Sequence, residues 1–108
     1  MEYVKITTNV PRSHADTVRQ AIGDAGAGVI GDYSYCSFTI TGKRRFLPSK
    51  SAQPFIGKAG TPEVVEEEHI EVVCQRSEAE KVITALRQAH PYQEVALEIS
   101  ALINEEDL

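Results

Sequence analysis

Hydrophobic and polar residues alternate along several stretches of the chain, and each such stretch predicts a strand. Residues 2–10 are rich in β-branched and aromatic types, and Val4, Ile6 and Thr8 share one face. Pro11 ends this strand, and apolar residues then recur at helical spacing up to the glycines 26 and 28. Residues 33–47 alternate again, and they predict a long second strand with Cys36, Phe38 and Ile40 on its inward face.

The second half of the chain repeats this order. Residues 63–75 predict a third strand, with Ile70, Val72 and Cys74 on its inward face. Ser77 and Glu80 have the spacing of a capping box for a second helix, which carries a regular apolar stripe (Ala79, Val82, Ile83, Leu86, Ala89). Pro91 ends that helix, and residues 94–100 predict a last strand with Val95, Leu97 and Ile99 inward.

The element order βαββαβ predicts a single α+β domain, residues 1–108, of the ferredoxin-like plan. Right-handed crossovers place both helices on one face of a four-stranded antiparallel sheet. The other face, with Tyr35, Val73 and Ala96, is half apolar, so we expect another subunit to cover it. The Pro-, Gly- and Ser-rich residues 48–62 form one long loop, and loops of this length are usually functional.

Composition narrows the possible partners and compartments. The net charge of -5 opposes binding to nucleic acid or anionic lipid, and no stretch is apolar enough to span a membrane. The N-terminus lacks the pattern of a signal peptide and the two cysteines lack a disulfide framework, so we expect a cytoplasmic protein. Residues 103–108 are acidic and polar, which is typical of a frayed tail.

Four short motifs, in order along the chain, resemble a known family. They are Tyr33–Phe38 (YSYCSF), Arg45–Pro48 (RFLP), Gln53–Gly57 (QPFIG) and His90–Glu94 (HPYQE). Over about residues 2–102 the chain is similar to the inserted central domain of YqfO-type proteins of the Nif-three-like superfamily, a domain with the CutA and PII fold. One departure is Gln93, where the family tends to have Glu.

This resemblance carries several expectations. The CutA and PII proteins pack as trimers, so we expect a homo-oligomer, with a trimer favoured over a dimer. PII-type proteins grip partners with the connection between strands two and three, which here is the loop 48–62. The larger family members hold two metal ions on flanking halves that this chain does not possess, so no catalytic or metal site is carried over and no cofactor is indicated.

Two groups of residues are candidates for ligand or partner binding. Lys43, Arg44 and Arg45 lie opposite the glutamates 66–68 in the predicted hairpin, which cross-strand pairing explains. Alternatively, these cations hold an anionic ligand together with Lys50 and Lys58. In the loop, Phe55 and Ile56 need cover, which a partner or a neighbouring subunit would supply.

The corner His90–Pro91–Tyr92 is open to two interpretations. It is a turn in which the imidazole hydrogen-bonds backbone, or it is a site at which His90 and Tyr92 contact a ligand. A CutA-like metal site using Cys36, His69, Cys74 or His90 is an alternative, although buried thiols are usually small hydrophobes. No set of nucleophile, base and orienting group is evident, since Glu67, His69 and Glu71 read as a solvated strand face.

The sequence therefore predicts a non-enzymatic binding or accessory module. Its candidate binding residues are Arg44, Arg45, Phe55, His90 and Tyr92, and its ligand or protein partner is expected beside the loop.

Overall fold

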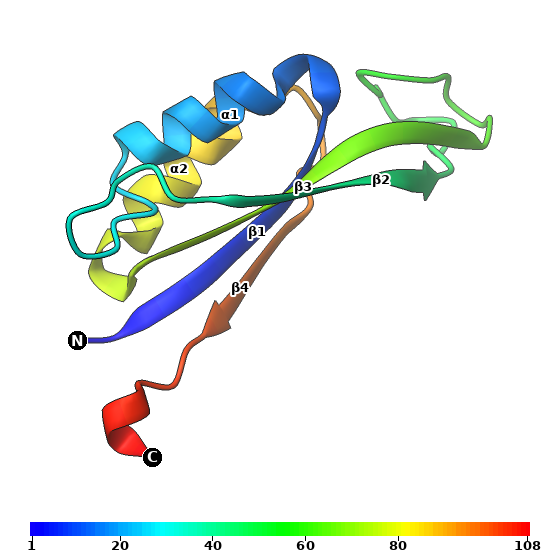
Figure 1. Ribbon diagram of the computed structural model, residues 1–108. Coiled ribbons are helices and arrows are strands. Elements are labelled where there is room, and N and C mark those ends of the chain that lie inside the picture. Colours follow the sequence, from blue (N-terminus) through cyan, green and yellow to red (C-terminus); the bar gives the residue numbers. More distant parts are fainter.

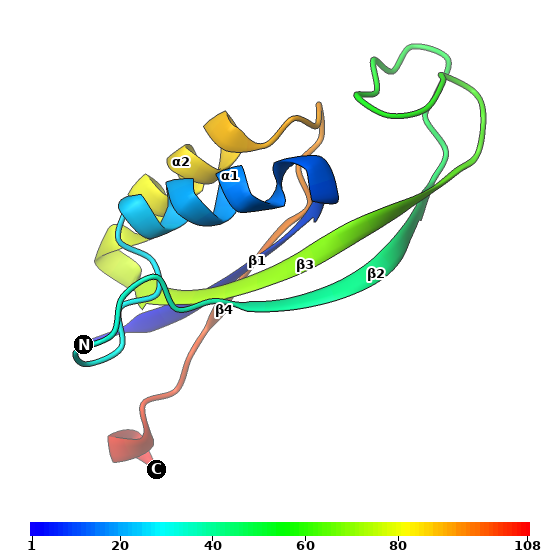
Figure 2. The same cartoon turned by 45° about the horizontal axis from the view of Figure 1, so that its top comes forward.

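The computed structural model describes all residues, 1–108, as one four-stranded sheet with two helices on one of its faces (Figures 1 and 2). All neighbouring strands are antiparallel, in the order β2-β3-β1-β4. The elements are β1 (Tyr3–Pro11), α1 (Arg12–Asp24), β2 (Phe38–Phe46), β3 (Glu63–Gln75), α2 (Ala79–Ala89) and β4 (Leu97–Ala101), with single 3₁₀ turns at Arg76–Glu78 and Glu105–Asp107. The predicted ferredoxin-like plan is confirmed.

The core lies between the helices and the sheet. Alternate residues of the two central strands point toward the helices, and each helix packs one apolar face against them. The largest fully buried side chains are Ile6, Val10, Val18, Ile22, Ile70, Val82 and Leu86. The predicted stripe of α2 is confirmed, because Val82 and Leu86 are buried and Ala79, Ile83 and Ala89 pack beside them.

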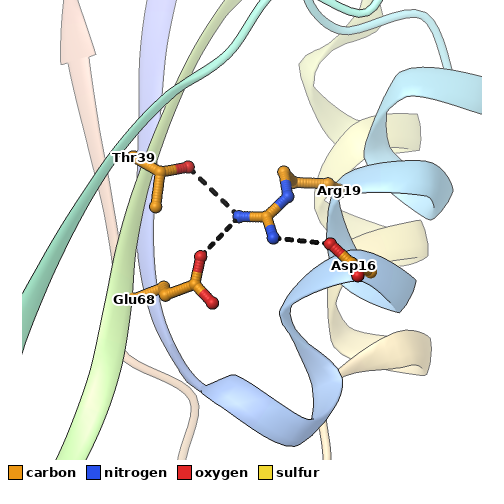
Figure 3. Close-up of polar contacts among 4 residues, drawn as sticks. All are labelled: Asp16, Arg19, Thr39 and Glu68. Atoms are coloured by element: carbon orange, nitrogen blue, oxygen red, sulfur yellow. Dashed lines mark hydrogen bonds and ion pairs between the residues drawn. The ribbon is translucent and has the colours of Figure 1, made fainter.

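Arg19 of α1 ties its helix to two strands (Figure 3). One of its terminal nitrogens, Nη1, donates to Thr39 Oγ1 of β2 at 3.1 Å and to Glu68 Oε1 of β3 at 2.9 Å. The other, Nη2, donates to Asp16 Oδ1 at 2.7 Å, and this bond raises the pKa of Arg19. The guanidinium therefore fixes the position of α1 over the β2–β3 hairpin.

The predicted start and orientation of β2 are wrong. The strand begins at Phe38, because Tyr35 adopts a left-handed conformation with φ 57° that breaks the alternation upstream. In the resulting register Thr39 lies opposite the buried Ile70 and faces the helices. Phe38 and Ile40 consequently point to the other face, where they are 62% and 52% exposed.

Tyr35 and Cys36 lie outside the sheet rather than on opposite faces of a strand. The ring of Tyr35 packs on Gly23 of α1, where any larger side chain would collide with it, and its hydroxyl donates to Asp24 Oδ1 at 2.8 Å. Cys36 passes close to Gly28, whose φ of 82° and lack of a side chain both permit this approach. Tyr35 thus caps the C-terminal end of α1 and does not contribute to the open sheet face.

Three further boundaries differ from the prediction. Neither helix has a side-chain cap: Pro11 stands at the N-cap of α1, and Glu78, not Ser77, stands at that of α2 after the 3₁₀ turn. The capping box is therefore absent. The last strand covers Leu97–Ala101 instead of 94–100, because the chain first passes around the end of β1. Ile99 and Leu97 lie opposite the buried Ile6 and Thr8 and so face the helices as predicted, although Ile99 on this edge strand is still 49% exposed.

The molecule is elongated, with principal extents of 49 × 26 × 23 Å, because the β2–β3 hairpin extends beyond the helices (Figure 1). At the opposite end the last residues leave the sheet, and Asn104 Nδ2 donates to the Met1 carbonyl at 2.7 Å. No helix is long and apolar enough to cross a membrane.

Candidate functional site

The long connection between β2 and β3 folds back toward the first turn of α1 and the corner that follows α2 (Figure 2). Its base is closed by a hydrogen bond from Gly60 N–H to the Pro48 carbonyl at 2.7 Å. The Gln53 backbone N–H donates to Gln93 Oε1 at 3.0 Å, so the residue that departs from the family pattern holds the loop. The predicted loop is confirmed, and its contacts lie within the same chain.

Aromatic side chains join the loop to the corner. The Phe55 ring meets the His14 ring edge-on, with 5.2 Å between their centroids, and its centroid lies 6.3 Å from that of Tyr92. Phe55 is still 50% exposed. Its cover is therefore partial and comes from α1 and the corner.

Between the loop and the corner lies a cleft of about 300 Å³. Arg44 of β2, Phe55 of the loop and Tyr92 of the corner all line it, and half of its lining residues are hydrophobic. Clefts of this size and character, apolar with a few polar groups, are typical of small-molecule sites. Three of the five predicted binding residues, far apart in the sequence, thus meet in one place.

A buried carboxylate stands behind this cleft. Glu67 of β3 is 3% exposed, and the Tyr92 hydroxyl donates to its Oε2 at 2.6 Å. Burial and this bond raise the pKa of Tyr92 well above its usual range. The other oxygen, Oε1, has no hydrogen-bond partner, and its nearest cation is Arg44 Nη1 at 3.9 Å. Arg44 and Tyr92 therefore interact with the same carboxylate, that of Glu67.

His90 holds the corner by hydrogen bonds to the backbone and does not line the cleft. It is 6% exposed, its Nε2 donates to the Asn9 carbonyl at 2.7 Å, and its Nδ1 accepts from the Tyr92 N–H at 3.2 Å. Burial lowers its pKa, which favours this neutral form. Both ring nitrogens are thus occupied by the backbone, in agreement with the structural interpretation of the corner.

The acidic run 66–68 does not pair with the basic run 43–45 as predicted. Only Arg44 and Glu67 form an ion pair across the hairpin. Glu66 and Glu68 turn to the helix face, where Arg12 and Arg19 of α1 meet them at 3.8 Å and 2.9 Å. Arg45 is exposed beside the cleft, in an adjoining hollow of about 380 Å³ that is lined by residues of β1, β2 and β3.

The four candidate metal ligands do not converge. Cys74 is buried under the helices, which raises the pKa of its thiol, whereas Cys36 lies off the strand on which it was predicted. His69 is on the opposite sheet face, with Nδ1 2.6 Å from Asn9 Oδ1 and Nε2 3.1 Å from Glu71 Oε2. No group of three or more His, Cys, Asp or Glu side chains is arranged to hold a metal ion.

Glu67 is the site residue that the sequence interpretation missed, since it was read as part of a solvated strand face. No local signal marks it, because the side chain that covers the carboxylate, Tyr92, lies 25 residues farther along the chain.

Comparison with known proteins agrees with the predicted kinship. No family model matches the chain. A protein of Halalkalibacterium halodurans named "GTP cyclohydrolase 1 type 2 homolog" is 46% identical over 101 residues, which are 94% of this chain and 27% of that protein. The chain therefore spans about a quarter of the length of this relative.

Solved structures support the same relationship. A Bacillus cereus protein related to NIF3 superposes with a TM-score of 0.83 at 44% identity, over 95% of this chain and 26% of that one. CutA1 from Pyrococcus horikoshii (TM-score 0.69, 14% identity, 96% of this chain and 89% of that one) and GlnK from B. subtilis (0.64, 11%, 94% and 86%) share the fold alone. The chain belongs to the YqfO/NIF3 family, as a homologue of the CutA/PII-like segment of these longer proteins.

Proposed function

We propose that this chain is a non-enzymatic, homo-oligomeric binding module whose ligand or protein partner occupies the cleft between the loop 47–62 and the corner 90–94. The convergence of Arg44, Phe55 and Tyr92 on that cleft is the observation that carries the proposal. A concave, half-apolar surface with a few polar groups is the usual form of a binding site.

A binding role without catalysis is supported by the chemistry of the lining. The aromatic rings and the guanidinium can pack against and orient a ligand. The nearest imidazole of the corner, His90, is buried with both nitrogens occupied, so it is not free to move a proton. The names of the longer relatives refer to whole proteins about three and a half times the length of this chain, and their activity does not enter the proposal.

Assembly is supported by the face of the sheet that the helices leave open. Phe38 and Ile40 on β2 are more than half exposed there, next to the partly covered Val73. Large apolar side chains gathered on one strand face are typical of subunit contacts. We propose a homotrimer, because the CutA and PII proteins, whose fold this chain shares, pack as trimers.

The neutral dye N-phenyl-1-naphthylamine tests the cleft, because its fluorescence rises in apolar surroundings. We expect the dye to bind and to shift the backbone amide NMR signals of residues 44–56 and 92–94. Phe55→Asp places a charge in the cleft and should abolish binding, whereas Ile30→Asp, on a remote exposed loop, should leave it unchanged. Shifts confined to other residues, or undiminished binding by Phe55→Asp, would contradict the proposal.

A further inference from the structure

The charges around the cleft indicate what kind of ligand it takes. We propose that it binds a small organic anion with an apolar body, such as an aromatic carboxylate or sulfonate, whose acid group pairs with Arg44. The inference rests on the proposed function and deepens it, because it names the chemical class of the ligand.

The guanidinium of Arg44 is exposed to the cleft and available to bind an anion. Its side chain lines both the cleft and the adjoining hollow, and it is about one-third exposed. It makes no hydrogen bond within the chain. Its one ionic contact, to Glu67 Oε1, is 3.9 Å long, which is beyond hydrogen-bond distance. The planar fork of N–H donors is therefore available for a bidentate bond to a carboxylate or sulfonate.

The surrounding chain is basic although the whole protein is acidic. Residues 43–58 contain Lys43, Arg44, Arg45, Lys50 and Lys58 and no acidic residue, in a chain of net charge -5. Lys43 and Arg45 line the hollow next to the cleft and have no carboxylate within 4 Å. The facing strand β3 places Glu63, Glu66 and Glu67 opposite residues 42–46, so the positive charge belongs to the β2 side and the loop alone.

The acidic groups nearby do not cancel this preference. Glu67 lines the adjoining hollow but not the cleft, and it is buried and bound to the Tyr92 hydroxyl. Glu94 lines the cleft but is exposed to solvent, which screens its charge. The acid group of a ligand can therefore pair with the Arg44 guanidinium, whose one ionic contact within the chain is the 3.9 Å contact with Glu67.

The rest of the cleft favours an apolar body. Phe46, Leu47, Phe55 and Ile56 line it together with the ring of Tyr92. Aromatic rings of the ligand can stack near Phe55, which still has half of its surface exposed. A free inorganic phosphate would leave these side chains unused, and a nucleic acid would meet the acidic remainder of the molecule.

Two dyes that differ in one sulfonate test this inference. 8-Anilinonaphthalene-1-sulfonate carries the anionic group, and N-phenyl-1-naphthylamine lacks it. We expect the sulfonate dye to bind about tenfold more tightly, in keeping with one charge-assisted bond. Arg44→Gln should remove most of this preference and leave the affinity for the neutral dye within about twofold. Arg76→Gln, at the far end of the molecule, should change neither affinity.

A second variant keeps the inference testable if Arg44→Gln disturbs the fold. Replacing Lys43 and Arg45 together with Gln removes no contact of the fold and should weaken binding of the sulfonate dye alone. Equal affinities for the two dyes, or an unchanged preference in Arg44→Gln and in the double variant, would overturn the inference while leaving the cleft as a binding site. Failure of both dyes to shift the cleft amides would contradict the proposed function itself.

Discussion

Glu67 shows at the scale of one residue how a charge is held inside this small domain. Burying an ionised carboxylate is unfavourable unless hydrogen bonds or a nearby cation offset the loss of water. Here Tyr92 supplies a 2.6 Å hydrogen bond to one oxygen, and Arg44 lies 3.9 Å from the other. The carboxylate thereby links the corner after α2 to β2, and it contacts two of the polar groups that line the cleft, Arg44 and Tyr92.

Removing the Tyr92 hydroxyl should therefore destabilise the fold. In Tyr92→Phe the buried Glu67 carboxylate loses its hydrogen bond, and we expect the free energy of unfolding to fall by about 1–3 kcal/mol. Urea unfolding measures this change. Tyr33→Phe is the matched control, since Tyr33 is 75% exposed, and its effect should stay within about 0.5 kcal/mol. Equal stability of Tyr92→Phe and wild type would show that Glu67 does not depend on this bond.

Among the elements, α1 depends on polar as well as apolar contacts with the sheet. Arg19 reaches Thr39 and Glu68 from a partly buried position, with 26% of its side chain exposed and 17% of that of Glu68 (Figure 3). Partly buried, hydrogen-bonded ion pairs contribute more than exposed ones, because solvent screens them less.

A double-mutant cycle measures this contact. We expect Arg19→Gln and Glu68→Gln to show a coupling energy of about 1 kcal/mol in urea unfolding. The same cycle on Arg76 and Glu2, whose side chains are 67% and 75% exposed, should give a value near zero. A coupling in the first pair no larger than in the second would remove Arg19 from the contacts that position α1.

The bounds of the strands and helices show which parts of the fold could be predicted from the sequence. The bounds of β3, 63–75, were predicted correctly because its alternation is unbroken. The start of β2 was not, because alternation over 33–37 hides the left-handed Tyr35, a conformation that the pattern does not reveal. The capping box failed for a related reason, since Ser77 lies inside a 3₁₀ turn instead of preceding the helix.

The site was predictable in part. Loop composition and the motif around the corner pointed to Arg44, Phe55 and Tyr92, and these residues do meet. Their meeting within one chain, and the burial of Glu67 between them, depend on how the loop folds back, which no local pattern encodes. Phe38 and Ile40 were assigned to the wrong face because the prediction placed the apolar set inward, whereas the register with β3 sets Thr39 opposite the buried Ile70.

At the scale of the whole molecule, the two faces of the sheet differ in what covers them. The helices cover one face of the sheet and bury the core, whereas β2 presents Phe38 and Ile40 on the other. The basic segment 43–58 lies at the end where the β2–β3 hairpin extends beyond the helices (Figure 1), and the cleft lies between this segment and the corner 90–94.

Native mass spectrometry of the untagged protein at low micromolar concentration tests the account most directly, because it counts subunits. We predict three chains for the wild type. Ile40→Asp, which places a charge on the open face, should give a monomer, and Gln88→Asp, on the exposed side of α2, should remain trimeric. A wild-type monomer, or an Ile40→Asp variant that still assembles, would contradict the claim that this face joins the subunits.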